Sequence, residues 1–78
     1  MQISMSKLRP GERGIIFCIQ AEPKLKRRLI ELGFMPGEMV ECVGRGFFHS
    51  PGAYKIAGGV MAVRDVDGEK VTLKKYNL

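Results

Sequence analysis

The sequence has no tryptophan, one histidine and two cysteines among its 78 residues. A zinc site built from this chain alone would therefore be short of ligands, and a catalytic triad is not expected. The chain has no apolar run near the ~20 residues that cross a bilayer. Its first residues also lack the apolar core and cleavage site of a signal peptide. We therefore expect a cytoplasmic protein.

The usual signatures of catalysis are also missing. The chain has no glycine-rich phosphate-binding loop ending in lysine, and no dinucleotide-binding glycine pattern after a strand. No serine or cysteine stands in a nucleophile motif. Cys18 and Cys42 fall inside predicted strands, and a reducing cytosol makes a disulfide between them improbable. We predict a protein that is not an enzyme, with no cofactor and no small-molecule substrate.

The length and charge set further limits. A chain of this size forms one domain, which we assign to residues 1–78, with a small core. The formal net charge is +5. A basic surface of this kind suits nucleic acid, an acidic protein partner, or nothing beyond solubility. Only the stretch Lys24–Arg28 is densely basic, so composition by itself does not choose among these partners.

The stretch Lys24–Val40 is the most informative one. Leucines spaced at i, i+4 and i+7 predict an amphipathic helix whose apolar face packs onto the core; they are Leu25, Leu29 and Leu32. Gly33 stands where a helix needs a residue with positive φ, and Phe34 can fold back onto the last turn. Pro36 and Gly37 then suit the centre of a type II turn before a strand.

Alternating or β-branched segments predict strands over 13–20, 38–44, 53–57, 60–64 and 70–75. The first of these is apolar on both faces, which predicts cover on both sides. Gly58 and Gly59 fit a two-residue hairpin turn, whereas residues 1–7 carry little pattern and residues 65–68 suggest a plain turn. We therefore predict a mainly β fold: a small SH3-like barrel of about five short strands, with one α-helix between strands 1 and 2.

Two surface features are candidates for binding a partner. The predicted helix carries Lys24, Arg27 and Arg28 outside its leucine face, together with Lys26. They form either a solvated face or a docking surface for acidic protein or phospholipid. Phe47 and Phe48 are adjacent in the loop from Arg45 to Gly52, where they either cover the barrel or form an exposed apolar patch. His49 is expected to be a surface residue without a metal.

The order of motifs along the chain is distinctive. The stretch 29–40 has the pattern L-x-x-L-G-F-x-x-G-x-x-V, preceded by L-x-P-G-E-x-G and followed by Y-x-I-x-G and A-V-R. This order resembles that of the ferrous iron transport protein A (FeoA) family, from about Leu8 to Leu73. The resemblance implies a bacterial protein with an SH3-like barrel that assists FeoB, a membrane permease for ferrous iron with a cytosolic G-protein domain. It also implies binding of ferrous iron or another divalent metal, for which the sequence offers no ligand set.

We therefore predict a non-catalytic accessory protein that binds the cytosolic GTPase-containing part of a FeoB-type permease. It would reach the membrane only through that partner. The residues assigned to the contact are Lys24, Arg27, Arg28, Phe47 and Phe48. One alternative is a small basic barrel that binds nucleic acid, although the strands do not interleave aromatic and basic residues. The other is a metal-binding regulatory domain like those that end some metal-dependent repressors.

Overall fold

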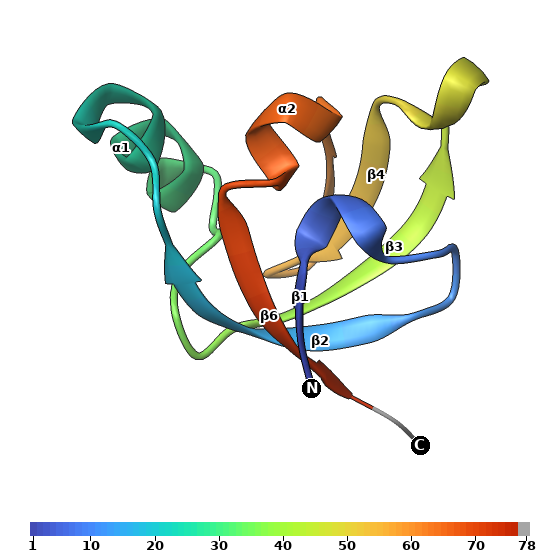
Figure 1. Ribbon diagram of the computed structural model, residues 1–78, viewed down its shortest axis with the longest axis horizontal. Coiled ribbons are helices and arrows are strands. Elements are labelled where there is room, and N and C mark those ends of the chain that lie inside the picture. The colour runs from blue at the N-terminus through green and yellow to red at the C-terminus, as the bar shows by residue number, and fades with distance from the viewer. Residues whose placement is uncertain (77–78) are drawn as a thin grey trace.

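The computed structural model describes residues 1–76, and residues 77 and 78 of the predicted domain lie outside this part. Within it, six strands are joined by two short α-helices and two single 3-10 turns (Figure 1). In chain order they are β1 (Gln2–Ser4), η1 (Met5–Lys7), β2 (Arg13–Ile19), α1 (Pro23–Glu31), β3 (Met39–Arg45), η2 (Phe47–His49), β4 (Gly52–Ile56), β5 (Gly59–Val63), α2 (Asp65–Gly68) and β6 (Val71–Tyr76).

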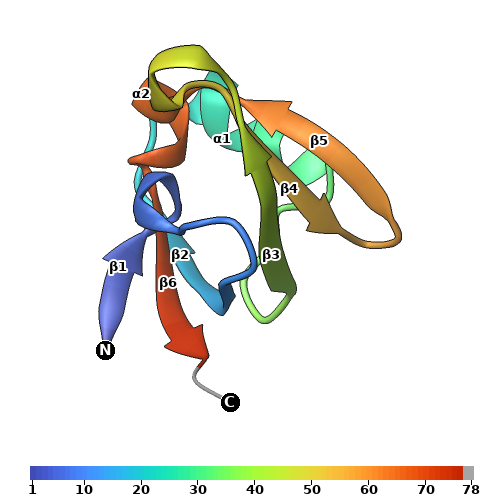
Figure 2. The ribbon, with the colours of Figure 1, turned by 90° about the vertical axis from the view of Figure 1, so that its right-hand side faces the viewer.

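The strands form one antiparallel sheet in the order β1-β6-β2-β3-β4-β5. The sheet curls, and α1, α2 and η2 all lie at one end of the molecule (Figures 1 and 2). No pairing among residues 1–76 joins β1 to β5, so the sheet is open and both of these strands are edges. The predicted mainly β class is confirmed, whereas full closure of a barrel is not found. No helix in this part of the chain is long and apolar enough to span a bilayer.

The prediction of five strands and one helix between the first two differs from the structure. A further strand, β1, precedes the others, so α1 lies between the second and third strands. A second helix, α2, forms where a plain turn was predicted. Strand β1 pairs with β6, for instance Ile3 with Leu73, and the following Met5 is fully buried. These elements are too short to show a periodic pattern in the sequence. They depend instead on neighbours that are distant in the sequence.

The local structure of the stretch Lys24–Val40 is confirmed. Helix α1 has Pro23 in its first turn and ends at Glu31, and Gly33, just past the C-cap Leu32, has a positive φ of 108°. The N–H of Phe34 donates to the carbonyl of Leu29 at 2.9 Å, which satisfies an acceptor at the helix end. Gly37 has φ of 94°, as the predicted type II turn requires. Propensity and turn chemistry therefore determine this segment locally.

Strand β2 is not covered on both faces, contrary to the prediction. Its pairing with β6 shifts register between Ile16 and Cys18, so one residue is added at that point. The bulge allows both Ile16 and Ile19 to be buried, at 2% and 6% exposure. Phe17 lies on the open face at 49% exposure, with the Lys74 ammonium 5.2 Å from its ring centre. The apolar run thus reflects a bulge rather than two covering layers.

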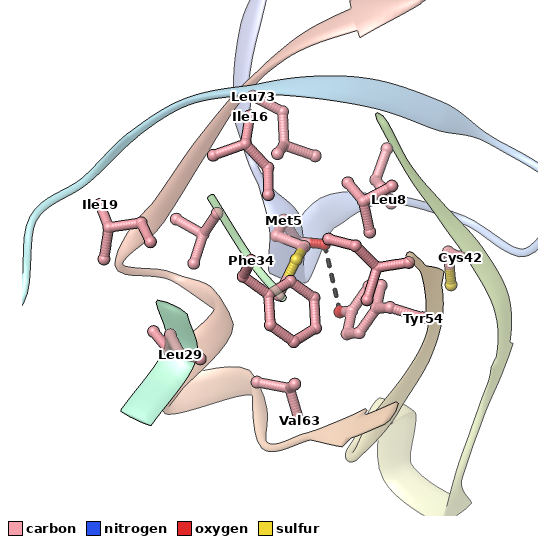
Figure 3. Packing of buried hydrophobic residues seen from close by; sticks show 13 residues of the cluster. Met5, Leu8, Ile16, Ile19, Leu29, Phe34, Cys42, Tyr54, Val63 and Leu73 are labelled. Atoms are coloured by element: carbon pink, nitrogen blue, oxygen red, sulfur yellow. Dashed lines mark hydrogen bonds between the residues drawn. The ribbon is translucent and has the colours of Figure 1, made fainter. Parts of the chain in front are cut away.

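The core lies inside the curl of the sheet, and Figure 3 shows its packing. Phe34 and Tyr54 meet edge to face at its centre, with ring centroids 6.5 Å apart. Of the predicted helical leucines, Leu29 is buried, whereas Leu25 and Leu32 are partly buried and pack against the core from its margin. The buried apolar residues are Met5, Leu8, Ile16, Ile19, Leu29, Phe34, Val40, Cys42, Tyr54, Ile56, Val63, Val71 and Leu73.

The hairpin between β4 and β5 turns one residue earlier than predicted. Ile56 pairs with Gly59, so the turn residues are Ala57 and Gly58, with φ of 48° and 83°. Two successive positive φ angles identify a type I′ turn. Either register would place Tyr54 and Ile56 on the inner face, because side chains alternate along both strands. The hydrophobic pattern therefore could not decide between the two registers.

Gly52 and Gly44 form a matched pair for testing this packing. A Cβ on Gly52 would overlap the Tyr54 hydroxyl and lie 2.7 Å from Nη1 of Arg45, whereas nothing lies within 4 Å of a Cβ on Gly44. We expect Gly52→Ala to lower the free energy of unfolding by about 1–3 kcal/mol through overpacking. Gly44→Ala should change it by less than about 0.5 kcal/mol. Urea denaturation measures both, and equal effects would contradict the packing.

The Glu12 carboxyl makes the free energy of unfolding depend on pH. A hydrogen bond from Lys75, at 2.6 Å, and one from the Arg9 N–H lower the pKa of Glu12 below 4.5. A lowered folded-state pKa means that the unfolded chain binds the proton more readily. The stabilisation is therefore complete above pH 4.5 and is lost as the pH falls through the lower, folded-state pKa.

We expect Glu12→Gln to make the acid side of the stability profile less steep below pH 4.5, because the variant has no carboxylate at this position to protonate. Glu38→Gln is the matched control, because the exposed Glu38 side chain makes no ion pair within residues 1–76. Thermal unfolding at a series of pH values measures the difference. Identical acid limbs for Glu12→Gln and the unmodified chain would contradict it.

Candidate functional site

Arg45 is a buried cation at the end of β3, next to the loop that carries the predicted phenylalanines. Its side chain is 6% exposed. Nε donates to the Leu8 carbonyl at 3.0 Å, and Nη2 donates to the carbonyls of Leu8 and Ser6 at 2.6 and 2.7 Å. Nη1 donates to Oδ1 of Asp65 at 3.0 Å. One guanidinium therefore joins β3, the η1 segment and α2.

Arg45 also fixes the loop that follows it. Nη1 donates a further hydrogen bond to the His49 carbonyl at 3.3 Å. The N–H of Gly46 donates to the Pro51 carbonyl at 2.9 Å, and the N–H of Asp65 donates to Oγ of Ser50 at 3.1 Å. Phe48 and His49 have positive φ angles of 57° and 77°, which cost conformational energy in residues with a Cβ. The surrounding hydrogen bonds hold the loop in this strained form.

The loop presents both phenylalanines to solvent. Phe47 is 91% exposed and Phe48 is 99% exposed. Of the two alternatives for this pair, the structure therefore shows the exposed patch and not a cover over the core. Exposure of two adjacent large apolar side chains is unfavourable in water, and such patches mark binding sites in soluble proteins. The hydrogen bonds of the loop hold its backbone in this exposed arrangement.

The Tyr54 ring packs against the Arg45 guanidinium. Its hydroxyl donates to the Met5 carbonyl at 3.2 Å, and the Arg45 guanidinium carbon lies 5.6 Å from its ring centre. Burial raises the pKa of Tyr54, and the nearby Arg45 opposes this effect in part. Tyr54 is therefore a neutral donor at physiological pH. The cation rests on an aromatic ring while its N–H groups face carbonyl oxygens.

His49 is a surface residue, as predicted, although it also has partners. Its side chain is 56% exposed, with Nε2 3.2 Å from the Ser6 carbonyl oxygen and 3.6 Å from Oδ2 of Asp65. No group of three or more histidine, cysteine, aspartate or glutamate side chains that could hold a metal ion occurs in the described part of the chain. The donors around His49 thus do not fit a metal centre, because Asp65 is already bound to Arg45.

The basic residues of α1 border a groove. Lys24, Arg27 and Arg28 are exposed, and together with Arg64 they line a groove of about 510 Å³. Acidic side chains also lie on its rim, and one of them, Asp67, pairs with Arg64 at 3.2 Å. A second hollow of about 360 Å³ adjoins it and has a mixed lining: the apolar Leu25, Leu29, Leu32, Ala62 and Val63, and the charged Arg28, Arg64 and Asp67.

The predicted contact residues form two separate groups. Helix α1 and the η2 loop lie at the same end of the molecule, but α2 stands between them (Figures 1 and 2). The structure therefore does not bring Lys24, Arg27 and Arg28 into contact with Phe47 and Phe48. A partner that reaches both groups must extend across α2. Their common orientation is compatible with one large partner rather than with a small ligand.

Sequence reasoning missed Arg45 and the groove. It placed Arg45 at the start of a loop, with only the flanking Gly44 and Gly46 as a sign of close packing. The partners of Arg45 lie 37 to 40 residues away in the sequence, apart from His49 and Asp65. The groove depends on how α1 packs beside Arg64 and Asp67, and no local pattern specifies that packing.

Arg45→Lys tests whether the planar guanidinium is required. Lysine keeps the charge but cannot reproduce the fork of donors. We expect the free energy of unfolding to fall by roughly 2–3 kcal/mol, because buried carbonyls would lose partners. Arg64→Lys is the control, since its side chain is 73% exposed, and should cost less than about 0.5 kcal/mol. Urea denaturation measures both, and equal losses would refute the role of Arg45.

The chain is related to known proteins both in sequence and in structure. The FeoA domain family matches residues 3–75 of the chain. No curated protein matches the chain significantly. The chain also resembles solved structures across almost its whole length.

A crystal structure of an iron uptake regulatory protein (FeoA) superposes with a TM-score of 0.87 at 21% identity, covering 97% of this chain and 99% of that one. FeoA from Stenotrophomonas maltophilia, solved with zinc, gives 0.81 at 26% identity, covering 92% of this chain and 89% of that one. It is described as an SH3 domain protein suggested to act as a bacterial ferrous iron transport activating factor.

A manganese-dependent transcriptional repressor in complex with manganese gives a TM-score of 0.87 at 16% identity, covering 96% of this chain and 37% of that one. At this identity the likeness concerns the fold alone. The fold is thus the SH3-like one that the sequence predicted, with an open sheet. Since the family match extends over nearly every described residue, the chain belongs to the FeoA family, whose name links it to ferrous iron transport.

Proposed function

We propose that this protein is a non-catalytic accessory factor of ferrous iron uptake that binds the cytosolic, GTPase-containing part of a FeoB-type permease. The observation that carries the proposal is the pair of phenylalanines, 91% and 99% exposed on a braced loop. Membership of the FeoA family supports a partner related to transport. The described residues offer a surface for binding rather than a reaction centre.

Phe47 and Phe48 would supply most of the binding free energy. Transfer of one phenylalanine side chain from water into a partner's pocket is worth about 1.5–3 kcal/mol. Hydrogen bonds from Arg45 to the His49 carbonyl and from the Gly46 N–H to the Pro51 carbonyl hold the loop without a partner. The complex therefore loses little conformational entropy at the loop, which improves affinity. Aromatic anchors held in this way are typical of binding hot spots.

The basic helix would guide the encounter. Lys24, Arg27 and Arg28 are exposed and make no ion pair within residues 1–76. Their field attracts an acidic partner surface and raises the association rate more than the final affinity. This steering weakens as salt is added, since the Debye length falls. We therefore assign steering to α1 and anchoring to the η2 loop.

Replacing both phenylalanines tests the anchoring surface. We expect Phe47→Ser combined with Phe48→Ser to weaken binding to the isolated cytosolic domain of the permease at least tenfold, because about 1.4 kcal/mol or more of apolar burial is lost. Met35→Ser is the matched control, since Met35 is 43% exposed at the turn between α1 and β3, away from η2. Isothermal calorimetry at two salt concentrations measures both variants.

Unchanged affinity in the double variant would reject the phenylalanine surface, and no binding by the unmodified protein would reject the proposed partner. The same salt series, run with single-stranded nucleic acid, tests the alternative of a nucleic-acid-binding barrel. Phosphate contacts would give a steep linear fall of log K with log salt. Tight binding with such a slope would favour the alternative.

A further inference from the structure

Strand β5 is an edge of the sheet that lacks the usual protection. It pairs with β4 on one side, without any register shift from Gly52↔Val63 to Ile56↔Gly59, and with no strand of residues 1–76 on the other. Its sequence, GVMAV, contains no charge and no proline. Natural edge strands are usually short, charged, bulged or interrupted by proline, because an open edge recruits other chains. The opposite edge, β1, has only three residues.

The hairpin geometry identifies which backbone groups are open. A two-residue turn is closed by a hydrogen-bonded pair, here Ile56 with Gly59, and such pairs alternate along an antiparallel ladder. Met61 and Val63 therefore bond to β4 through their backbones. The N–H and C=O groups of Val60 and Ala62 point away from β4. No hydrogen bond within residues 1–76 occupies these backbone groups of Val60 and Ala62.

Beside this edge runs the hollow of about 360 Å³ that separates β5 from α1. Leu25 and Leu32 form part of its apolar lining, and both are only partly buried. Arg28 and the ion pair of Arg64 with Asp67 complete the lining, and the rim continues into the larger groove, where Arg27 is exposed. An added strand would thus find a backbone ladder on one side, leucine side chains on the other, and cations along its margin.

We propose that the β5 edge binds an extended segment of a partner protein, apolar at its centre and acidic at its flanks, which pairs with Val60 and Ala62 as a seventh strand. This rests on the proposed function, because the segment is taken to belong to the same partner that the η2 loop anchors. Main-chain pairing supplies the geometry, and side chains facing α1 supply selectivity. The segment's carboxylates complement Arg27 and Arg28, which make no ion pair within residues 1–76, whereas Arg64 is already paired with Asp67.

A second copy of this chain is the competing occupant. The uncharged strand could pair with its own copy, with Val60 opposite Ala62 of the other copy. However, each chain carries a net charge of +5, and the basic α1 of both copies would be brought towards one interface. Repulsion between like charges opposes that pairing and favours an acidic segment. The experiment below separates the two.

The test uses a fluorescein-labelled synthetic peptide with a valine-leucine-valine centre and glutamates at both ends, and amide hydrogen exchange of the unmodified protein. We expect the amides of Val60 and Ala62 to exchange at least about tenfold more slowly when the peptide is bound, because opening would then require its release. The same peptide with N-methylated alternate amides should not bind. A lysine-flanked peptide should bind at least about tenfold more weakly.

Variants of Ala62 separate the edge from the rest of the fold. Ala62→Pro removes the outward N–H without removing a bond to β4, as proline is tolerated on an edge. Ala62→Val keeps the N–H and is the matched control. We expect Ala62→Pro to lower the affinity for the peptide at least tenfold, and Ala62→Val to leave this affinity unchanged. Circular dichroism checks that both fold, and Val60→Pro is the second variant if Ala62→Pro does not.

Several outcomes would overturn the proposal: no peptide binding at about 1 mM, no protection of Val60 and Ala62, or equal binding of the N-methylated peptide. Protection that grows with protein concentration in the absence of peptide would show self-pairing instead. The proposed function is judged separately. If the phenylalanine double variant loses the permease domain while Ala62→Pro keeps it, the edge proposal fails and the proposed function stands. If no permease domain binds at all, the peptide titration still decides the edge.

Discussion

The structure depends on one buried cation and the carbonyl groups that surround it. Arg45 directs its donors to the carbonyls of Leu8 and Ser6 and to the carboxylate of Asp65. The chain between β1 and β2 forms no ladder with the sheet at this point, so its carbonyls need other donors. A planar guanidinium can satisfy several of them at once, which an ammonium cannot. No buried side-chain nitrogen or oxygen within residues 1–76 is left without a partner.

The same interaction connects stability with the exposed surface. The Arg45 guanidinium also donates to the His49 carbonyl, so the side chain that anchors the N-terminal turn also keeps the η2 loop in place. A small domain has few apolar contacts with which to fix a loop. A buried charge with several hydrogen-bond partners fixes it with a single side chain. Phe47 and Phe48 can therefore stay exposed at the cost of backbone strain nearby.

Parts of the fold could be predicted because their causes are local. Gly33 ends α1 and Gly37 completes the turn after it, since both positions require positive φ. The bulge in β2 could not be predicted, because an apolar run such as Ile16 to Ile19 fits two covered faces equally well. Among the predicted site residues, the exposure of Phe47 and Phe48 was left open by the sequence. The position of α2 between α1 and the η2 loop (Figure 1) could likewise not be predicted from it.

The amino-acid sequence by itself determined the strand-rich class, the amphipathic α1, its glycine stop and the order of motifs that marks the family. These features arise from residue periodicity and backbone preference within about ten residues. Only the tertiary structure decided that β1 pairs with β6, that α2 forms at residues 65–68, and that Arg45 is buried. The physical reason is that each of these features depends on groups brought together from distant parts of the chain. In the case of Arg45, one side chain satisfies several backbone acceptors.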